Sequence, residues 1–116
     1  MEKRVQELKV AGGSPVALDR DGYLKHLDDW SEEVALLLAE QEGLVLGDAH
    51  WEIIRGLRTF YERHQLSPAS RALVRFVKQE FGADKGNSIY LMKLFPGNPA
   101  LKASKIAGLP RPRNCF

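Results

Sequence analysis

The spacing of apolar residues changes near residue 28, and this change constrains the fold more than any other feature of the chain. Before it, residues 5–10 and 15–18 alternate loosely on either side of a Gly-Gly turn signal, which is typical of paired strands. A second turn at residues 19–22 leads into a third short strand at residues 23–24. After residue 28 the apolar positions recur at helical spacing. Strands followed by helices predict one α+β domain, with a small N-terminal antiparallel β-meander packed on an array of four to five helices.

Local signals predict where these helices begin and end. Residues that cap or favour a helix N-terminus stand at Asp29 with Glu32, Asp48, Ser67 with Pro68, and Asn87. Residues that end helices stand at Gly43, Gly82 and the Pro96-Gly97-Asn98-Pro99 run. Residues 100–106 are expected to add one or two further helical turns.

Length and composition set the broad class of protein. A chain of 116 residues is long enough for one hydrophobic core and too short for two. It contains no apolar run near the roughly 20 residues that span a bilayer, and residues 1–5 lack the apolar stretch of a secretory signal. We therefore expect a cytoplasmic protein with no membrane partner. Its single cysteine cannot form an internal disulfide, and a reducing compartment preserves an exposed thiol.

That cysteine, Cys115, stands one residue from the end of the chain, behind two prolines. Pro110 and Pro112 lack backbone donors and favour extended, polyproline-like geometry, so this segment cannot be an ordinary helix. We therefore expect a body of residues 1–107 and an extended C-terminal arm of residues 108–116. The thiol on this arm is available to something outside the chain.

Positive charge is concentrated toward the arm. The chain has a net charge of +2, yet residues 85–116 hold six Lys and Arg with no Asp or Glu, and residues 1–84 sum to −4. A basic tail can serve solubility alone. Alternatively, the charge steers the arm into an acidic groove of a partner, or toward the phosphates of a nucleic acid that the partner holds. Six cations spread over this length fall short of a nucleic-acid-binding patch, so direct binding of nucleic acid is expected to be weak at most.

Metal and acid-base sites have little support. The histidines are scattered without the spacing of a zinc site, at positions His26, His50 and His64. We therefore expect no metal site and no cofactor. His50 lies beside Trp51 near a helix start, where a structural role is favoured over acid-base chemistry.

The remaining aromatic and basic residues of the helical segments are expected to have structural roles. Four aromatic residues are expected in the core or against the arm rather than as a stacking platform for bases: Trp51, Tyr61, Tyr90 and Phe95. Arg58 and Arg71 are expected on a solvated or ion-paired face, with the alternative that they receive the arm.

Sequence motifs along the chain indicate a family. Residues 105–112 read Lys-Ile-Ala-Gly-Leu-Pro-Arg-Pro and are followed by the penultimate Cys115. Other motifs follow one another in order, namely Asp21-Gly22-Tyr23-Leu24, Trp30, His50-Trp51-Glu52-Ile53-Ile54, Arg58, Tyr61, Pro68 with Arg71, Gly86-Asn87-Ser88, Tyr90-Leu91 and Leu94-Phe95-Pro96. Together they resemble the DsrC/TusE family of sulfur-trafficking proteins over nearly everything after about residue 10. The resemblance implies the same α+β architecture, with an arm that can lie on the body or extend away.

This resemblance implies a sulfurtransferase. The thiolate of such a carrier attacks a donor persulfide, holds the sulfane sulfur as its own persulfide, and releases it in a second active site. The catalytic nucleophile would be Cys115. Candidate groups for docking and for stabilising the thiolate are Lys105, Arg111 and Arg113. The geometry of the arm would depend on Gly108, Pro110 and Pro112.

One position distinguishes the branches of the family. Members that work with dissimilatory sulfite reductase have a second cysteine eleven positions before the terminal one, and this chain has Ser104 there. Single-cysteine members accept sulfur from an upstream relay complex (TusBCD-like). They pass it to a tRNA 2-thiouridylase (MnmA-like) that acts on the wobble uridine of bound tRNA. The resemblance implies these partners for this chain.

Two alternatives stay open at this point. The first is a DsrC-like carrier or regulator in a sulfur-oxidation or sulfite-reduction pathway. Genomic neighbours or pull-down partners would distinguish it from a sulfur relay to tRNA. The second is a DNA-binding regulator, because residues 48–81 also fit a helix-turn-helix. Its recognition helix would present Arg71, Arg75 and Lys78.

Overall fold

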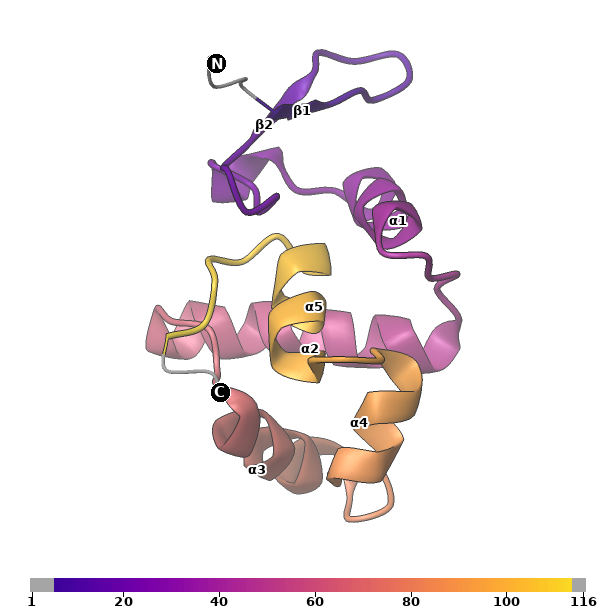
Figure 1. Cartoon of the computed structure of the whole chain (residues 1–116). Coiled ribbons are helices and arrows are strands. Elements are labelled where there is room, and N and C mark those ends of the chain that lie inside the picture. Colours follow the sequence, from indigo (N-terminus) through magenta and orange to yellow (C-terminus); the bar gives the residue numbers. More distant parts are fainter. Residues whose placement is uncertain (1–5, 114–116) are drawn as a thin grey trace.

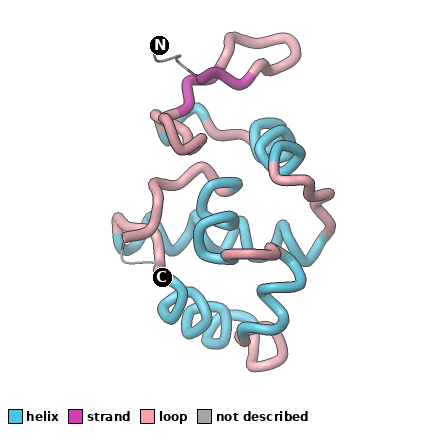
Figure 2. Tube along the Cα trace, viewed as in Figure 1, coloured by secondary structure: helices cyan, strands magenta, loops and turns pink. Residues whose placement is uncertain are grey.

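The computed structural model describes residues 6–113, and over this range a two-stranded sheet precedes a set of α-helices (Figures 1 and 2). Strand β1 (Gln6–Leu8) pairs with β2 (Val16–Leu18) in antiparallel register, with Leu8 opposite Val16. Leu8, Val16 and Leu18 are buried, so one face of this small sheet packs on the helices. The predicted α+β class, with strands before helices, is confirmed.

The expected third strand is reduced to one bridge between Leu18 and Leu24. The Asp19 carboxylate accepts hydrogen bonds from the backbone N–H groups of Asp21 and Tyr23, which closes the chain into a tight turn. Two residues after Leu24 the chain enters a short 3₁₀ helix, η1 (Leu27–Asp29), so no length remains for a strand.

Helix α1 (Glu32–Gln41) begins at Ser31 and not at Asp29, so the predicted cap was wrong. Asp29 belongs to the η1 turn, where its backbone N–H already donates to the carbonyl of His26. The Ser31 hydroxyl accepts from the Val34 N–H at 3.2 Å and caps α1. The predicted end at Gly43 is confirmed, because its φ of 76° is a conformation that glycine adopts without strain.

Four further helices complete the fold, and they are α2 (Asp48–His64), α3 (Ser70–Phe81), α4 (Ser88–Leu94) and α5 (Pro99–Ile106). The predicted start of α4 is confirmed, since the Asn87 side chain accepts from the Tyr90 N–H at 2.9 Å. The predicted start of α3 was wrong. Its cap is Ala69, and the hydroxyl of Ser67 is engaged elsewhere, by a carbonyl of the C-terminal segment.

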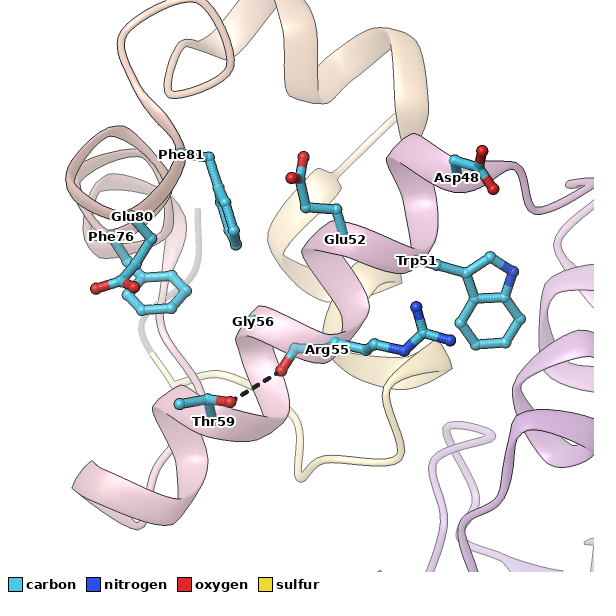
Figure 3. Close-up of a pocket in the computed structure, with 9 residues that line it drawn as sticks. All are labelled: Asp48, Trp51, Glu52, Arg55, Gly56, Thr59, Phe76, Glu80 and Phe81. Atoms are coloured by element: carbon cyan, nitrogen blue, oxygen red, sulfur yellow. Dashed lines mark hydrogen bonds between the residues drawn. The ribbon is translucent and has the colours of Figure 1, made fainter.

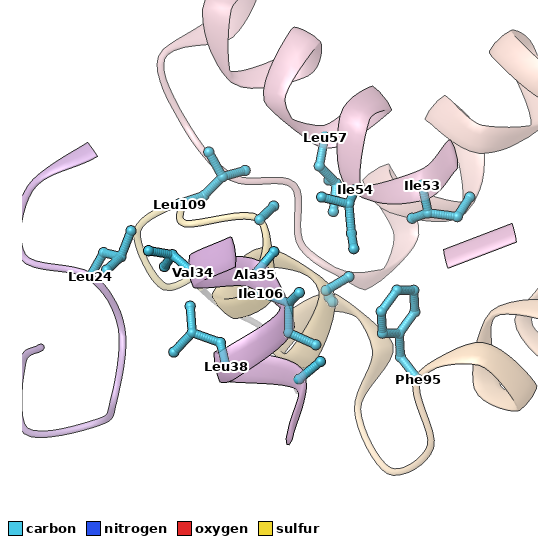
Figure 4. Packing of buried hydrophobic residues seen from close by; sticks show 14 of the residues in the cluster. Leu24, Val34, Ala35, Leu38, Ile53, Ile54, Leu57, Phe95, Ile106 and Leu109 are labelled. Atoms are coloured by element: carbon cyan, nitrogen blue, oxygen red, sulfur yellow. The ribbon is translucent and has the colours of Figure 1, made fainter. Parts of the chain in front are cut away.

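Helix α5 lies at the centre of the helical array and contacts α1, α2, α3 and α4 (Figure 1). Figure 4 shows how its Ile106 and the following Leu109 pack between side chains of α1 and α2. Leu109 is only 1% exposed, so the core extends past the end of the last helix. Burial of each such aliphatic side chain contributes about 1.5–3 kcal/mol. The segment that leads to the arm is therefore held by the core itself.

Across residues 6–113, no helix has both the length and the apolar composition needed to cross a bilayer.

Candidate functional site

The candidate site is the C-terminal segment that leads to Cys115. Cys115 itself lies outside the described residues, so its catalytic role stays a prediction. The structure describes the two stretches before it, which we call the arm root (residues 106–109) and the arm tip (residues 110–113). The arm root lies in the core and the arm tip crosses the surface near the loop between α2 and α3 (Figure 1).

Gly108 sets the direction in which the chain leaves α5. Its N–H donates to the Lys105 carbonyl at 3.0 Å, and the Leu109 N–H donates to the Ser104 carbonyl at 2.9 Å. This pair of bonds is the Schellman arrangement that ends many helices, with glycine at a left-handed φ of 76°. A Cβ at Gly108 would lie 2.4 Å from Cδ1 of Trp30. Both the φ angle and the space therefore require glycine.

Two side chains hold the carbonyls of the arm root. Trp30 Nε1 donates to the Ile106 carbonyl at 2.9 Å, and Arg58 Nη1 donates to the Ala107 carbonyl at 2.6 Å. The Arg58 guanidinium also stacks over the Trp30 ring, 4.1 Å from its centroid. Burial lowers the pKa of Arg58 from its usual value. These bonds satisfy carbonyls that the end of an α-helix leaves without partners.

The arm tip is held by fewer contacts. The Ser67 hydroxyl donates to the Pro110 carbonyl at 2.5 Å, and Pro112 is buried. Arg111 is exposed, and its guanidinium lies near the hydroxyl of Tyr23, which donates to the Leu101 carbonyl at 3.1 Å. Burial raises the pKa of Tyr23 to about 12, and the positive charge of Arg111 opposes this shift. Arg113 is exposed and lines a hollow of about 620 Å³, together with Tyr61, Leu66, Ala69 and other residues of this region.

Lys105 lies on α5, before the arm. Its Nζ is 2.6 Å from a carboxylate oxygen of Glu42, and the two side chains are only 15% and 20% exposed. A half-buried pair of this kind is held more firmly than the usual surface ion pair. The charge of Lys105 is thus largely neutralised in the structure, and its predicted role in docking stays a prediction.

Ser104, at the position of the second cysteine in other branches, is fully buried. Its hydroxyl has no hydrogen-bond partner among residues 6–113. An unpaired buried hydroxyl is unusual and costs free energy. A serine here cannot form a disulfide, so a two-cysteine chemistry is not available to this chain.

The roles of Trp30 and Ser67 in holding this segment were not predicted from the sequence. Ser67 has the sequence signature of a helix cap, and only the structure shows that its hydroxyl binds the arm tip. The preferred expectation for Arg58, a solvated or ion-paired face, was wrong, because Arg58 donates to the Ala107 carbonyl directly before the predicted arm. Arg71 is exposed, as expected. The sequence signal that could have indicated this role of Arg58 was its position among the family motifs.

His50 has the structural role that its position favoured. Its Nδ1 accepts from the Gly47 N–H at 3.0 Å, so Nε2 carries the proton that bonds the Leu94 carbonyl at 2.9 Å. Phe95 is fully buried against its ring, in an edge-to-face contact with centroids 5.3 Å apart. Both ring nitrogens of His50 are engaged, and neither is free for acid-base chemistry.

A second hollow of about 620 Å³ lies between α2 and α3, away from the arm (Figure 3). Gly56 keeps it open, because a Cβ there would lie 3.1 Å from the Phe81 ring. Three of its charged groups pair with neighbours outside the hollow: Glu52 contacts Lys85 at 2.8 Å, Arg55 contacts Glu32 at 2.9 Å, and Glu80 contacts Arg63 at 3.9 Å. The residues that line the hollow include no cysteine or histidine, so it is not a second candidate site.

Comparisons with known proteins bear on the whole chain. The sequence model of the family described as DsrC like protein matches residues 10–116. A protein named Sulfurtransferase TusE from Photorhabdus laumondii is 52% identical over 107 residues, covering 92% of this chain and 96% of that protein. A Sulfurtransferase TusE from Escherichia coli O6:H1 is 48% identical over 104 residues, covering 90% of this chain and 95% of that protein.

Solved structures are similar to this fold as well. The NMR structure of Allochromatium vinosum DsrC has a TM-score of 0.88 and 43% identity, covering 97% of this chain and all of that one. The crystal structure of the oxidized gamma-subunit of the dissimilatory sulfite reductase (DsrC) from Archaeoglobus fulgidus has a TM-score of 0.80 and 39% identity, covering 96% of this chain and all of that one.

Proposed function

The chain belongs to the DsrC-like protein family, and from this premise we propose that it is a sulfurtransferase that carries sulfane sulfur as a persulfide on Cys115. The relatives named Sulfurtransferase TusE support this activity. Its acceptor is a tRNA 2-thiouridine synthase that thiolates the wobble uridine, as the single-cysteine branch of the family implies.

The observation that carries the proposal is the distance along the chain between the core and the only thiol. Within the described residues, Leu109 is the last member of the hydrophobic core, and Cys115 follows it by six residues. At about 3.3 Å per extended residue, a released arm carries the thiol roughly 20 Å from its fixed root. A thiol on such a tether can enter the active site of a donor and then that of an acceptor.

The transfer itself is balanced without an added oxidant or reductant. The Cys115 thiolate attacks the outer sulfur of a donor persulfide. The donor S–S bond breaks, a new S–S bond forms on Cys115, and the donor sulfur leaves as a thiolate. In the second transfer, an acceptor thiolate attacks the outer sulfur on Cys115, a new S–S bond forms on the acceptor, and Cys115 leaves as a thiolate. One sulfur atom moves in each step, and the number of S–S bonds does not change.

Arg111 and Arg113 are the cations placed to assist this exchange. Both are exposed, and they lie four and two residues before Cys115, respectively. Electropositive surroundings favour the thiolate, which is the attacking form. Lys105 is engaged by Glu42 at 2.6 Å, so it contributes less than the two arginines while that pair is intact.

A carrier in sulfite reduction or sulfur oxidation is the second candidate, because two of the similar solved structures are DsrC proteins, one of them a sulfite reductase subunit. Ser104 weighs against it. The second cysteine of that branch allows a disulfide between two thiols of one chain, and a serine does not. We therefore favour the relay to tRNA, with a TusBCD-like complex as donor and an MnmA-like enzyme as acceptor.

Intact-mass analysis tests the proposal. After incubation with a cysteine desulfurase and its relay proteins, the wild-type chain should gain one sulfur atom, and a reductant should remove it. Cys115→Ala should gain none. Ser104→Ala is the matched control, because it removes a hydroxyl that has no partner in the described part of the chain, and it should load like the wild type. A wild-type chain that gains no sulfur from a donor shown to be charged would overturn the proposal.

A further inference from the structure

We propose that the solvent face of α3, together with the arm tip, binds the phosphate backbone of the RNA to which the sulfur is delivered. We call this face the α3 stripe and define it as Arg71, Arg75 and Lys78. The inference rests on the proposed function, since it assumes an acceptor that holds RNA.

Two segments without acidic residues meet at this place. Residues 63–79 contain four Lys and Arg and no Asp or Glu, and residues 107–113 contain two Arg and no Asp or Glu. They are joined in space by the hydrogen bond from Ser67 to the Pro110 carbonyl. Arg113 lines the same hollow as Ala69, the residue that caps α3. The arm tip therefore leaves the body next to the first turn of the α3 stripe.

The α3 stripe has the geometry of a single exposed row. Its members are spaced by four and three residues, which places them on one face of the helix. All three are exposed, whereas Leu73, Phe76 and Val77 are buried. With a rise of 1.5 Å per residue, the row is about 10 Å long. Val74 borders the row and is partly buried against the core.

The described part of the chain does not use the charges of this row. None of the four ion pairs found among residues 6–113 includes Arg71, Arg75 or Lys78. The acidic residue of α3, Glu80, lies 3.9 Å from Arg63 of α2 and lines the hollow between the two helices. It therefore faces α2 and does not neutralise the row.

The segment around α1 has the opposite charge. Residues 19–42, which include α1, hold eight Asp and Glu against two Lys and Arg. Figure 1 shows α1 and α3 on opposite sides of α2 and α5, and the arm tip ends on the α3 side. A polyanion is therefore attracted to the α3 side and repelled from the acidic segment around α1, part of which borders Arg111.

Nucleic acid fits this surface better than an acidic protein does. Protein interfaces depend on buried aromatic and aliphatic anchors, and the row has none. A phosphate backbone is bound by Lys and Arg without such anchors, and these contacts position a nucleic acid without reading its sequence. An RNA seated on the row would lie next to the arm tip.

Salt-dependent binding tests the inference. The probe is a tRNA transcript with an unmodified wobble uridine, bound to its 2-thiouridine synthase, and binding of the full-length chain is measured between 50 and 200 mM salt (roughly the range over which phosphate contacts differ most). The test variant changes Arg71, Arg75 and Lys78 to Gln. The control variant changes Lys9, Arg20 and Lys93 to Gln, three exposed cations outside α3 and the arm tip, and has the same net charge.

The expected result is a loss of affinity of at least about tenfold in the test variant. Its log-log salt slope should fall by about 2, since each lost phosphate contact removes roughly 0.7–0.9 from that slope. The control variant should bind like the wild type. Equal affinity and slope in all three chains would overturn the inference, and so would tighter binding of a duplex DNA than of the tRNA complex.

Sulfur loading of Cys115 separates this inference from the proposed function. The test variant should gain one sulfur atom from the donor as the wild type does, because the α3 stripe takes no part in loading. If all three chains gain sulfur and the test variant binds the tRNA complex as tightly as the wild type, only the inference fails. If the wild type does not load, the proposed function fails first. Normal loading of the test variant also shows that it is folded.

Discussion

The arm root and the arm tip are four residues each, adjacent in sequence, and held in different ways. The root is held by burial of Ile106 and Leu109 in the core, by the Gly108 turn, and by bonds from Trp30 and Arg58. The tip is held chiefly by the Ser67 hydroxyl and by burial of Pro112, and its two arginines are exposed. The difference indicates that the root fixes where the arm starts while the tip can be released at little cost. The following predictions test that comparison.

Gly108→Ala should have the largest effect. The alanine is strained at a φ of 76°, and its Cβ overlaps the Trp30 ring. Strain of this kind costs about 1 kcal/mol, and overpacking costs about 1–3 kcal/mol more. We expect the free energy of unfolding, measured in urea, to fall by about 3 kcal/mol. Gly97→Ala is the control, because its φ is also positive but no atom lies closer than 3.6 Å, and it should lose only about 1 kcal/mol.

Arg58→Ala should destabilise the root by about 2 kcal/mol. The change leaves the buried carbonyl of Ala107 without its donor and removes the stacking on Trp30. The measurement is again urea unfolding. Arg55→Ala, on the same helix, removes an ion pair between two side chains that are about 60% exposed and should cost about 0.5 kcal/mol or less. Equal losses in the two variants would show that the root is not specifically held by Arg58.

Ser67→Ala should release the tip without unfolding the body. A single hydrogen bond contributes about 0.5–1.5 kcal/mol, which corresponds to a roughly 2- to 10-fold change in the released population. We expect Cys115 to react with iodoacetamide faster by about this factor, while the urea midpoint changes little. Ser14→Ala, at an exposed loop position, should react like the wild type. An unchanged alkylation rate in Ser67→Ala would mean that the hydroxyl does not restrain the arm.

Tyr23→Phe should produce the smallest effect, and this effect should depend on pH only at high pH. The pKa of Tyr23 is raised to about 12 by burial, so the folded state favours the neutral phenol. This contribution is complete below pH 10 and is lost as the pH rises toward 12. The stability difference between wild type and Tyr23→Phe should therefore shrink between pH 10 and 12. An ultraviolet titration should also show a late phenolate component that the variant lacks.

Part of this fold could be predicted from the sequence, and the errors have a common cause. The end of α1 at Gly43 and the start of α4 at Asn87 were predicted correctly, because each depends on a turn or cap within a few residues. The starts at Asp29 and Ser67 were wrong. In both cases the residue has the right type for a cap but its backbone or side chain is engaged by another partner.

The sequence by itself determined the order of elements, the positions of several helix ends, and the place of the only thiol behind two prolines, because periodicity, capping and covalent order act over a few residues. Only the tertiary structure decided what holds the arm. Trp30, Arg58 and Ser67 bind carbonyls that lie 76, 49 and 43 residues away along the chain. A backbone carbonyl is present at every residue, so the sequence does not mark which one a distant donor will bind. Packing of α5 at the centre of the core makes that choice.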